Sequence, residues 1–454
     1  MSSRTIPKSY NMKEQGPLSG FRDMLAEQVF PRQAMVDTIK KVYEKYGFVP
    51  QDTPAIERYE TLTGKYGPEG EKLMYKFKDH GGRDVALRYD LTVPLARIVF
   101  QYKDKITLPY KRYQVGNVWR GDRPQAGRYR EFMQFDADII GTSSPIADAE
   151  IVEMMVDTMR ALGVDAVVRV NNRLILDGLA EKSGVMDPAK TKIMITAIDK
   201  SEKIGKDAVL AEISESIDSE TAELVNAFLG VSGSDSEKLE QIAKILEGSV
   251  SAAEGVNNLQ QVFSIVRKSG YEPEKVKFDQ TIARGLDYYT GIIYETTLKD
   301  LPGVGSVCSG GRYDKLVSAL SSGKVDLPAV GTSVGVDRLF SGLEQLDKVK
   351  KTKTASQVLV INFDSADAPE YVSLASDLRK EGIPTEVYYD QVKIGKQIKF
   401  ANSLGIKFVI FLGFEEKKKN VYSVKNLETG EQQEVDKAKL IELLVPKIDS
   451  NPLI

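Results

Sequence analysis

A single stretch, residues 111–141, carries a high density of cationic side chains. It holds five arginines and the chain's only tryptophan around a loop of Gly, Pro and Gln residues. Because guanidinium groups bind phosphate oxygens in pairs, this stretch is suited to a phosphate-bearing compound. Gln134 and Asp138, which follow closely, can hold an amine or another donor nearby. The arginines are Arg112, Arg120, Arg123, Arg128 and Arg130.

The elements that position these side chains are predicted to be two antiparallel strands. Side chains alternate between the two faces of a strand, and residues 130–139 alternate between apolar and polar types. Residues 113–119 read as the partner strand, with 121–128 as a loop too long for a tight turn. We therefore predict a ribbon with one apolar face and one wet, mixed-charge face. The apolar set is Met133, Phe135, Ala137 and Ile139, and the polar set is Gln134, Asp136 and Asp138.

Composition limits the class of protein. A chain of 454 residues predicts two to four domains, and no apolar run approaches the roughly 18 residues of a membrane span. The N-terminal residues lack the apolar core of a signal peptide. One cysteine and one histidine exclude an internal disulfide and a His-based metal cage, so we expect a cytoplasmic protein without a membrane partner. Cys308 is read as a buried thiol and His80 as a turn residue.

The net charge of −3 gives no overall sign of nucleic-acid binding. A nucleic-acid partner would have to be met by local basic patches. Residues 393–419 contain such candidates in Lys393, Lys396, Lys399, Lys407 and Lys417 to Lys419. A run of charges is more often a solvated face, and the sequence leaves both interpretations open.

Residues 20–54 predict a long amphipathic helix followed by a short strand. Met35, Ile39, Val42, Tyr43 and Tyr46 recur at helical spacing. Such a helix packs either on its own core or on a second chain, and the pattern alone does not separate the two.

Residues 85–94 predict a strand that enters a helix. Asp90 and Thr92 lie at the junction, and Pro94 suits the first helical turn. Either side chain can cap the helix, and that role can coexist with ligand binding.

Three later segments combine glycines with groups that suit a binding site. Residues 284–291 hold Arg284 and the adjacent Tyr288 and Tyr289 between flanking glycines, which let a backbone approach a ligand closely. Residues 305–314 end in GGRYD, whose glycines can floor a pocket. Residues 329–339 predict a strand of small residues that feeds a helix carrying Arg338 in its first turn.

These segments, in this order, resemble the histidine-specific class II aminoacyl-tRNA synthetases. The segment RGDRPQAGRYREFMQ is similar to motif 2, and the octet that begins at Arg284 is similar to the peptide that distinguishes the histidine-specific enzymes. GGRYD is similar to the second specificity segment, and residues 329–339 are similar to motif 3. The helix and strand of 20–54 resemble motif 1, which in the family builds a dimer interface. Asp122 stands where glutamate is usual in motif 2, and Met133 stands where a ring residue is common.

The resemblance implies activation of L-histidine by ATP with Mg2+, then transfer of the acyl group to tRNA(His) by a homodimeric ligase. Positive charge and alignment are what the adenylation step requires. Arg120 and Arg284 are the implied catalytic residues. The implied histidine-binding residues are Asp90, Leu91, Thr92, Arg120, Gln134, Asp138, Arg284, Tyr288 and Tyr289. The implied ATP-binding residues are Arg120, Asp122, Arg128, Glu131 and Arg338.

The expected fold is an α+β catalytic domain on a mainly antiparallel sheet flanked by helices, with a helical insertion and a C-terminal α/β domain of the anticodon-binding type. Residues 357–454 alternate strands with short helices, which predicts parallel pairing. The insertion lies against tRNA in the family, and its residues fit a purely structural role equally well. The expected parts are the catalytic halves 1–179 and 269–346, the insertion 180–268, the linker 347–356 and the last domain 357–454.

Three alternatives remain open from the residues. One is a synthetase for another amino acid, against which the octet argues. The second is a non-catalytic paralogue such as the regulatory partner of the first enzyme of histidine biosynthesis. The third is a plain RNA-binding protein, which needs no arginine in the position of Arg338.

Overall fold

The computed structural model describes residues 16–124, 127–283 and 288–445. The chain forms two compact units. The first comprises the described residues up to Arg22 and Val36–Lys348, and the second comprises Asp23–Met35 and the residues from Val349 onward. None of the helices in the described ranges is both long enough and apolar enough to cross a membrane.

An eight-stranded sheet is the centre of the first unit, in the order β1-β5-β6-β11-β10-β9-β7-β8. Its neighbours pair antiparallel except β1 with β5 and β7 with β8, which pair parallel. The strands are β1 (Val49–Pro50), β5 (Tyr110–Trp119), β6 (Glu131–Ile140), β7 (Ala166–Asn172), β8 (Val276–Phe278), β9 (Ile292–Leu298), β10 (Ser306–Arg312) and β11 (Ala329–Gly335). The prediction of a mainly antiparallel sheet flanked by helices is confirmed.

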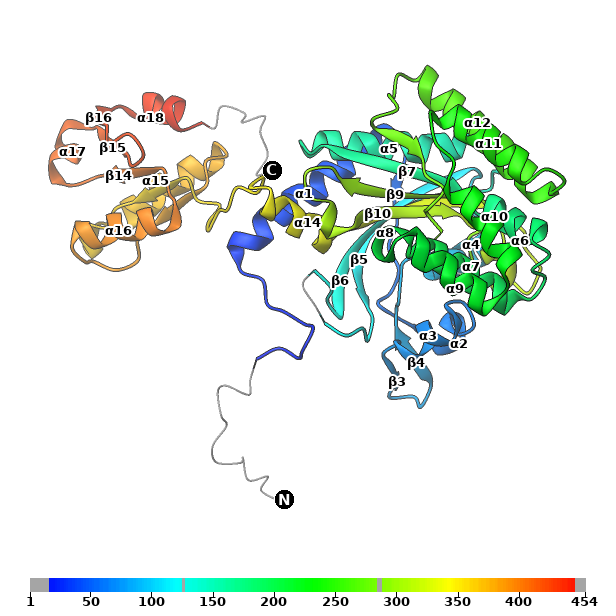
Figure 1. Ribbon diagram of the computed structural model, residues 1–454. Coiled ribbons are helices and arrows are strands. Elements are labelled where there is room, and N and C mark those ends of the chain that lie inside the picture. Colours follow the sequence, from blue (N-terminus) through cyan, green and yellow to red (C-terminus); the bar gives the residue numbers. More distant parts are fainter. Residues whose placement is uncertain (1–15, 125–126, 284–287, 446–454) are drawn as a thin grey trace. The chain divides into compact units, whose positions relative to one another are not determined.

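One face of this sheet is packed against helices. The ring of Tyr43 in α1 (Ala26–Lys45) lies 4.8 Å from the ring of Phe135 on β6. Helix α5 (Pro145–Ala161) contacts β7, β9 and β11, and its first turn is capped by the Ser144 side chain. The predicted apolar set of β6 therefore faces a helical layer (Figure 1).

A run of helices follows β7 and ends at α12 (Val250–Lys268), which packs on α6 and α5. Ser234 and Glu237 form a capping box that starts one of these helices, because each side chain accepts from the other residue's backbone N–H. The remaining helices of the run are α6 (Arg173–Lys182), α7 (Pro188–Asp199), α8 (Ser201–Ile204), α9 (Lys206–Ser216), α10 (Ser219–Leu229) and α11 (Asp235–Ile245).

A small sheet, β2-β4-β3, and nearby helices share a buried cluster with the end of β6. Helix α4 begins at Thr92 and contributes five buried residues. The exposed His80 lies in the turn between β3 and β4, as expected. The elements are β2 (Ile56–Arg58), α2 (Tyr59–Leu62), α3 (Gly67–Lys72), β3 (Lys76–Lys78), β4 (Asp84–Leu87), α4 (Thr92–Gln101) and α13 (Leu316–Leu320). Two further elements contact the large sheet instead, η2 (Pro302–Val304) and α14 (Val336–Gln345).

The second unit has its own five-stranded sheet, β13-β12-β14-β15-β16. The first three strands pair parallel, as predicted, whereas β15 and β16 add antiparallel strands. Two separate apolar clusters, one on α15 and one on α16, cover the two faces. The elements are β12 (Val358–Val360), η3 (Ser365–Asp367), α15 (Ala368–Lys380), β13 (Thr385–Val387), α16 (Ile394–Leu404), β14 (Phe408–Phe411), α17 (Phe414–Lys419), β15 (Tyr422–Asn426), β16 (Gln432–Val435) and α18 (Lys437–Leu444).

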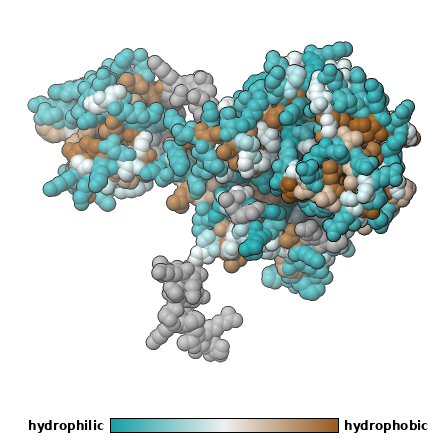
Figure 2. Space-filling model, viewed as in Figure 1, coloured by the Kyte–Doolittle hydropathy of each residue, from teal (hydrophilic) through white to brown (hydrophobic). Residues whose placement is uncertain are grey.

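The surface drawn in Figure 2 is mainly hydrophilic, with smaller apolar areas between the charged ones. This distribution fits a chain in which 28% of residues are charged.

Candidate active site

The polar face of β6 lies between β5 and β11 in a defined register. Asp138 stands opposite Arg112 on β5 and Gly331 on β11, and Asp136 stands opposite Ser333 on β11. Glycine is required at position 331, since a Cβ there would lie 1.9 Å from an Asp138 carboxylate oxygen. The small residues of β11 thus leave room for the carboxylate of the neighbouring strand.

The prediction that this face is open to solvent is wrong. Asp136 and Asp138 are only 2% and 3% exposed, and Arg112 is fully buried. The Arg112 guanidinium lies 2.7 Å from Asp138 and donates to the Leu91 carbonyl at 3.2 Å. Arg112 is therefore held in an internal ion pair through Nη2, whereas its buried Nε and Nη1 have no hydrogen-bond partner among the described residues. The alternation of apolar and polar residues along β6 predicted correctly which face each side chain occupies. Groups from distant segments of the chain cover the polar face.

Tyr313 belongs to the candidate site by its contact with Asp138, and the sequence interpretation did not include it. Its hydroxyl donates to Asp138, and burial raises its pKa so that the hydroxyl stays protonated at neutral pH. Its ring centroid lies 5.7 Å from that of Tyr288, which in turn lies 5.2 Å from Tyr289. This tyrosine lies in the segment GGRYD, which the sequence interpretation considered only for its glycines. The structure thus brings the 288–289 tyrosines and the end of β10 against β6.

Asp90 caps the start of a helix and also has a carboxylate oxygen that accepts no hydrogen bond from the described residues. One carboxylate oxygen accepts from the Tyr66 hydroxyl at 2.8 Å and from the Val93 backbone N–H at 3.1 Å. The other oxygen is buried and has no hydrogen-bond partner among the described residues. Burial raises the pKa of Asp90, while hydrogen bonds and the Arg120 charge oppose that rise. Asp90 therefore caps the helix through one oxygen and has a second oxygen that can accept from a ligand.

The neighbours of Asp90 connect it to the tyrosines. Thr92 lies within hydrogen-bonding reach of the Tyr288 hydroxyl, a contact that opposes the burial-driven rise in the pKa of Tyr288. The Leu91 side chain is fully buried, so it can contribute only an apolar surface here. Because Arg112 joins Leu91 to Asp138, the segment at 90–92 and the middle of β6 belong to one cluster.

Arg120 lies at the end of β5 in a fixed position. Its guanidinium stacks over the rings of Tyr89 and Phe132, at 4.4 and 5.2 Å from their centroids. Its Nε donates to the Tyr89 carbonyl at 3.0 Å. The remaining guanidinium nitrogens keep their donor capacity for a ligand oxygen.

The predicted ATP-binding residues occupy the loop side of the ribbon and the start of α14. Arg128 forms an ion pair with Asp122 at 2.8 Å, and Glu131 accepts from the Asn117 amide at 2.9 Å. Arg338 is exposed and donates to the Ser306 carbonyl at 2.9 Å. Arg284, the second predicted catalytic residue, lies outside the described residues.

The start of α14 is fixed to β6 by a carboxylate. Asp337 accepts from the Met133 backbone N–H at 2.6 Å and forms an ion pair with Arg22. The Arg22 guanidinium also stacks on Tyr129, 3.7 Å from the ring centroid. These contacts hold Arg338 beside the ribbon.

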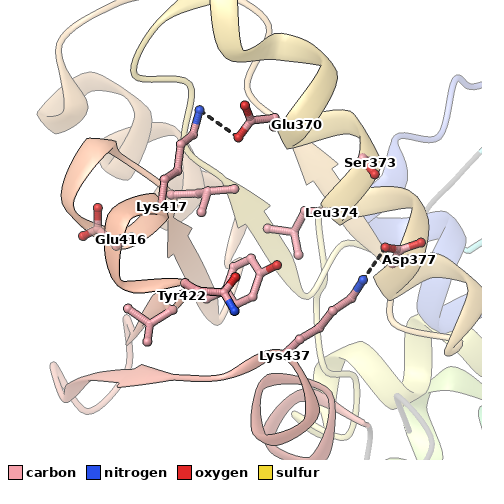
Figure 3. A pocket seen from close by; sticks show the side chains of 11 residues that line it. Glu370, Ser373, Leu374, Asp377, Glu416, Lys417, Tyr422 and Lys437 are labelled. Atoms are coloured by element: carbon pink, nitrogen blue, oxygen red, sulfur yellow. Dashed lines mark hydrogen bonds and ion pairs between the residues drawn. The ribbon is translucent and has the colours of Figure 1, made fainter.

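Two surface cavities contain none of the predicted site residues. One, of about 280 Å³, lies between α15, α17 and α18 in the second unit (Figure 3). Its lysines are paired internally, Lys417 with Glu370 at 2.8 Å and Lys437 with Asp377 at 2.6 Å. The other, of about 390 Å³, lies beside α2, α4 and α13 in the first unit. Both lysines that line the first cavity are therefore paired with carboxylates, and its third carboxylate, Glu416, accepts from the Gly413 backbone N–H.

Comparison with known proteins gives the same family over nearly the whole chain. Residues 20–339 match the histidyl-tRNA synthetase family, and residues 357–447 match the anticodon binding domain. The histidine–tRNA ligase of Rhodopirellula baltica is 44% identical over 92% of this chain and 94% of its own length. That of Wolinella succinogenes is 41% identical over 93% of this chain and 97% of its own length.

Solved structures agree with the sequence relatives. The histidyl-tRNA synthetase from Nostoc superposes with a TM-score of 0.84 at 33% identity, covering 97% of this chain and 99% of its own. A protein from Bacillus halodurans, described as an ATP phosphoribosyltransferase regulatory subunit/histidyl-tRNA synthetase, shares the fold at a TM-score of 0.74 but only 21% identity, covering 89% of this chain and 99% of its own.

Proposed function

Because the chain belongs to the histidyl-tRNA synthetase family and is an ATP-dependent histidine–tRNA ligase, we propose that the cluster around β6 is where it binds histidine and ATP. Family membership decides against the three alternatives that the residues left open. The assignment of individual residues below is our proposal.

The observation that carries the assignment is a pair of buried acceptors without donors. Asp90 Oδ2 and Gln134 Oε1 have no hydrogen-bond partner in the described part of the chain. A buried acceptor without a donor costs about 1–3 kcal/mol, so a ligand that supplies N–H groups is favoured. Histidine supplies them from both its ammonium group and its imidazole ring.

We assign the ammonium group of histidine to Asp90, Thr92 and Gln134, and the imidazole to Asp138 with Tyr313. Asp138 accepts from one ring nitrogen, and its carboxylate is oriented by the Tyr313 hydroxyl. Leu91, Tyr288 and Tyr289 supply the apolar walls that a flat ring needs.

Adenylate formation then depends on charge neutralisation. A carboxylate oxygen of histidine attacks the α-phosphorus of MgATP, the bond to the β-phosphate oxygen breaks, and pyrophosphate leaves. No general base is needed because the substrate carboxylate is already ionised at neutral pH. Arg120 and Arg284 neutralise the α-phosphate and Arg338 the outer phosphates. The ribose hydroxyl of tRNA afterwards attacks the acyl carbon and AMP leaves.

Three further residues are assigned to the nucleotide. Arg128 reaches the outer phosphates by exchanging its ion pair with Asp122, and Asp122 and Glu131 accept from donors of the nucleotide. Mg2+ arrives as part of MgATP, because this ion keeps several waters and binds through substrate phosphates rather than in an all-protein cage. The described residues contain no cluster of three side chains that could hold a metal ion.

ATP–pyrophosphate exchange with each of the twenty amino acids tests this function. We expect exchange with histidine only, and its loss when EDTA removes Mg2+. Exchange driven better by another amino acid would contradict the proposed pocket.

For the tRNA we propose the carboxyl edge of the parallel strands in the second unit. The connection after β12 runs toward β13 at one edge of the sheet, and the connection after β14 runs toward β15 at the other edge. Ligands of such sheets bind at the carboxyl ends of the two neighbouring strands where the connections diverge. Tyr389 follows β13 and is 94% exposed, and Phe414 follows β14 and is 78% exposed. The lysine-rich start of α16 lies on the same edge.

Not every lysine predicted to contact RNA is equally available. Lys417 forms ion pairs with Asp367 and Glu370, and Lys419 forms one with Glu434. The proposal therefore rests on Lys393, Lys396 and Lys399 rather than on the lysine run of α17.

We expect Tyr389→Ala to raise the KM for tRNA about tenfold, because stacking on one base contributes about 1–3 kcal/mol. Pyrophosphate exchange, which needs no tRNA, should not change. Thr429→Ala, in the turn at the opposite edge of the sheet, is the matched control. A Tyr389 variant with normal aminoacylation kinetics would remove this edge from the RNA-binding surface.

We also propose a homodimer that works in the cytoplasm. The resemblance of α1 and β1 to motif 1 and the exposed apolar Val49 on the edge strand β1 support a second chain at this edge. A solution mass equal to a single chain would contradict the dimer. The tRNA substrate supports the cytoplasm, and recovery of the activity in a membrane or secreted fraction would contradict it.

A further inference from the structure

Three polar side chains on β6 and β11 form a chain of hydrogen bonds inside the proposed site. The register places Asp136 directly opposite Ser333. Ser333 Oγ donates to Asp136 Oδ1 at 2.5 Å, and Gln134 Nε2 donates to Ser333 Oγ at 2.9 Å. The other end of the Gln134 amide, Oε1, is shielded from solvent and has no partner in the described ranges.

The number of protons available on these groups determines which one donates in each hydrogen bond. A serine hydroxyl has one proton and an ionised carboxylate only accepts, so Ser333 must donate to Asp136. The Ser333 oxygen can then only accept, which turns Nε2 of Gln134 toward it and Oε1 away from it. We propose that Asp136 and Ser333 are positioning residues that present Gln134 as an acceptor to the ammonium group of histidine. This inference rests on the histidine site proposed above.

The opposite orientation of the amide would be unfavourable for the substrate. A flipped Gln134 would point an NH2 group at a cation, and neither group can accept a hydrogen bond. Because Oε1 is shielded, the ammonium reaches it only after a small local displacement of its neighbours. An unpaired buried carbonyl is costly, so its pairing with the ligand favours that displacement.

The hydrogen-bonded chain Gln134–Ser333–Asp136, called the relay below, also predicts that the KM for histidine depends on pH. Burial raises the pKa of Asp136 to about 7, with Asp138 and Asp90 adding to the rise and Arg112 opposing it. Below that pH the protonated carboxyl donates to Ser333, whose hydroxyl then donates to Gln134 Oε1 and turns the amide. The KM for histidine therefore rises as the pH falls through about 7.

The remaining groups that face Asp136 do not titrate near pH 7. Burial raises the pKa of each tyrosine and of the cysteine, and arginine keeps its charge. These groups are Tyr43, Arg88, Tyr288, Tyr289 and Cys308. The imidazole of the substrate also titrates in this range, so each profile must be compared with that of a variant measured with the same substrate.

The test uses the full-length enzyme and the variants Ser333→Ala, Ser333→Thr and Asp136→Asn. Pyrophosphate exchange gives the KM values for histidine and ATP at about pH 6 and about pH 8, on either side of the Asp136 pKa. Imidazolepropionate, which lacks the ammonium group, serves as a competitive inhibitor. We expect Ser333→Ala to raise the KM for histidine about tenfold, the loss of one hydrogen bond to a charged group.

Under the proposal, Ser333→Ala leaves the KM for ATP and the inhibition by imidazolepropionate unchanged. Ser333→Thr keeps the hydroxyl and keeps the normal KM for histidine. Asp136→Asn removes the titrating proton, so the KM ratio between the two pH values becomes smaller than in the native enzyme. Equal weakening of histidine and imidazolepropionate by Ser333→Ala would overturn the relay, because that pattern indicates general damage to the pocket.

Gln134→Ala separates the relay from the site on which it depends. If Gln134→Ala raises the KM for histidine and Ser333→Ala does not, the relay is wrong and the histidine site stands. If Gln134→Ala leaves the KM for histidine unchanged, the assignment of Gln134 to the ammonium group is itself wrong and the relay falls with it.

Discussion

Replacing Arg120 by alanine is expected to slow histidyl-adenylate formation by on the order of 10²–10³, the usual cost of removing a charge-stabilising group. Adenylation brings two anions together, so the guanidinium matters most when charge builds on the α-phosphate. The side chain is held in advance by the rings of Tyr89 and Phe132 and by the Tyr89 carbonyl. Little reorganisation is then needed during the reaction.

A single-turnover measurement of histidyl-adenylate formation gives this effect directly. Arg123→Ala is the matched control, since Arg123 is an exposed arginine of the adjacent loop to which we assign no role. We expect Arg284→Ala to show a loss like that of Arg120→Ala, with histidine binding nearly intact. A change under about threefold in either variant would remove that arginine from the catalytic set.

Arg312→Ala is expected to destabilise the first unit by about 3–5 kcal/mol, because it leaves a buried carboxylate without its counter-ion. Asp148 is fully buried on α5 and accepts from Arg312 Nε and Nη2 at 3.0 and 2.7 Å. The same guanidinium donates to the Thr142 carbonyl and to Asp314. Arg312 faces the helical layer, whereas the adjacent Tyr313 faces Asp138, so this ion pair also anchors the tyrosine of the proposed pocket.

Urea unfolding followed by Trp119 fluorescence tests this prediction, because the only tryptophan reports on the first unit. The double variant Arg312→Ala with Asp148→Asn should recover part of the lost free energy, since the unpaired charge is removed. Arg160→Ala, which removes an exposed ion pair with Asp157, should cost no more than about 1 kcal/mol. Similar losses for Arg312→Ala and Arg160→Ala would show that the buried pair contributes little.

Local periodicity was enough to predict most elements, and the resemblance of several motifs to known ones indicated the family. The alternation along 130–139 predicted β6 and its two faces, because the period of a strand is a property of neighbouring residues. The order of the arginine-rich loop, the paired tyrosines and the strand before Arg338 indicated the synthetase, and the comparisons confirm it. In the second unit the same reasoning found the strands, helices and parallel pairing of β13, β12 and β14.

Burial and partnership were decided only by tertiary structure. The sequence does not say what covers a polar face, because the covering groups come from segments far along the chain. Arg112 and Tyr313 turned a predicted wet face into a buried cluster, and acidic neighbours on η3 and α15 occupied Lys417. The register of β6 against β11, which joins Asp136 to Ser333 across 197 positions, is likewise invisible to local patterns. Residue types and spacing determined the chemistry of which this chain is capable, and packing between distant strands determined which side chains are free to perform it.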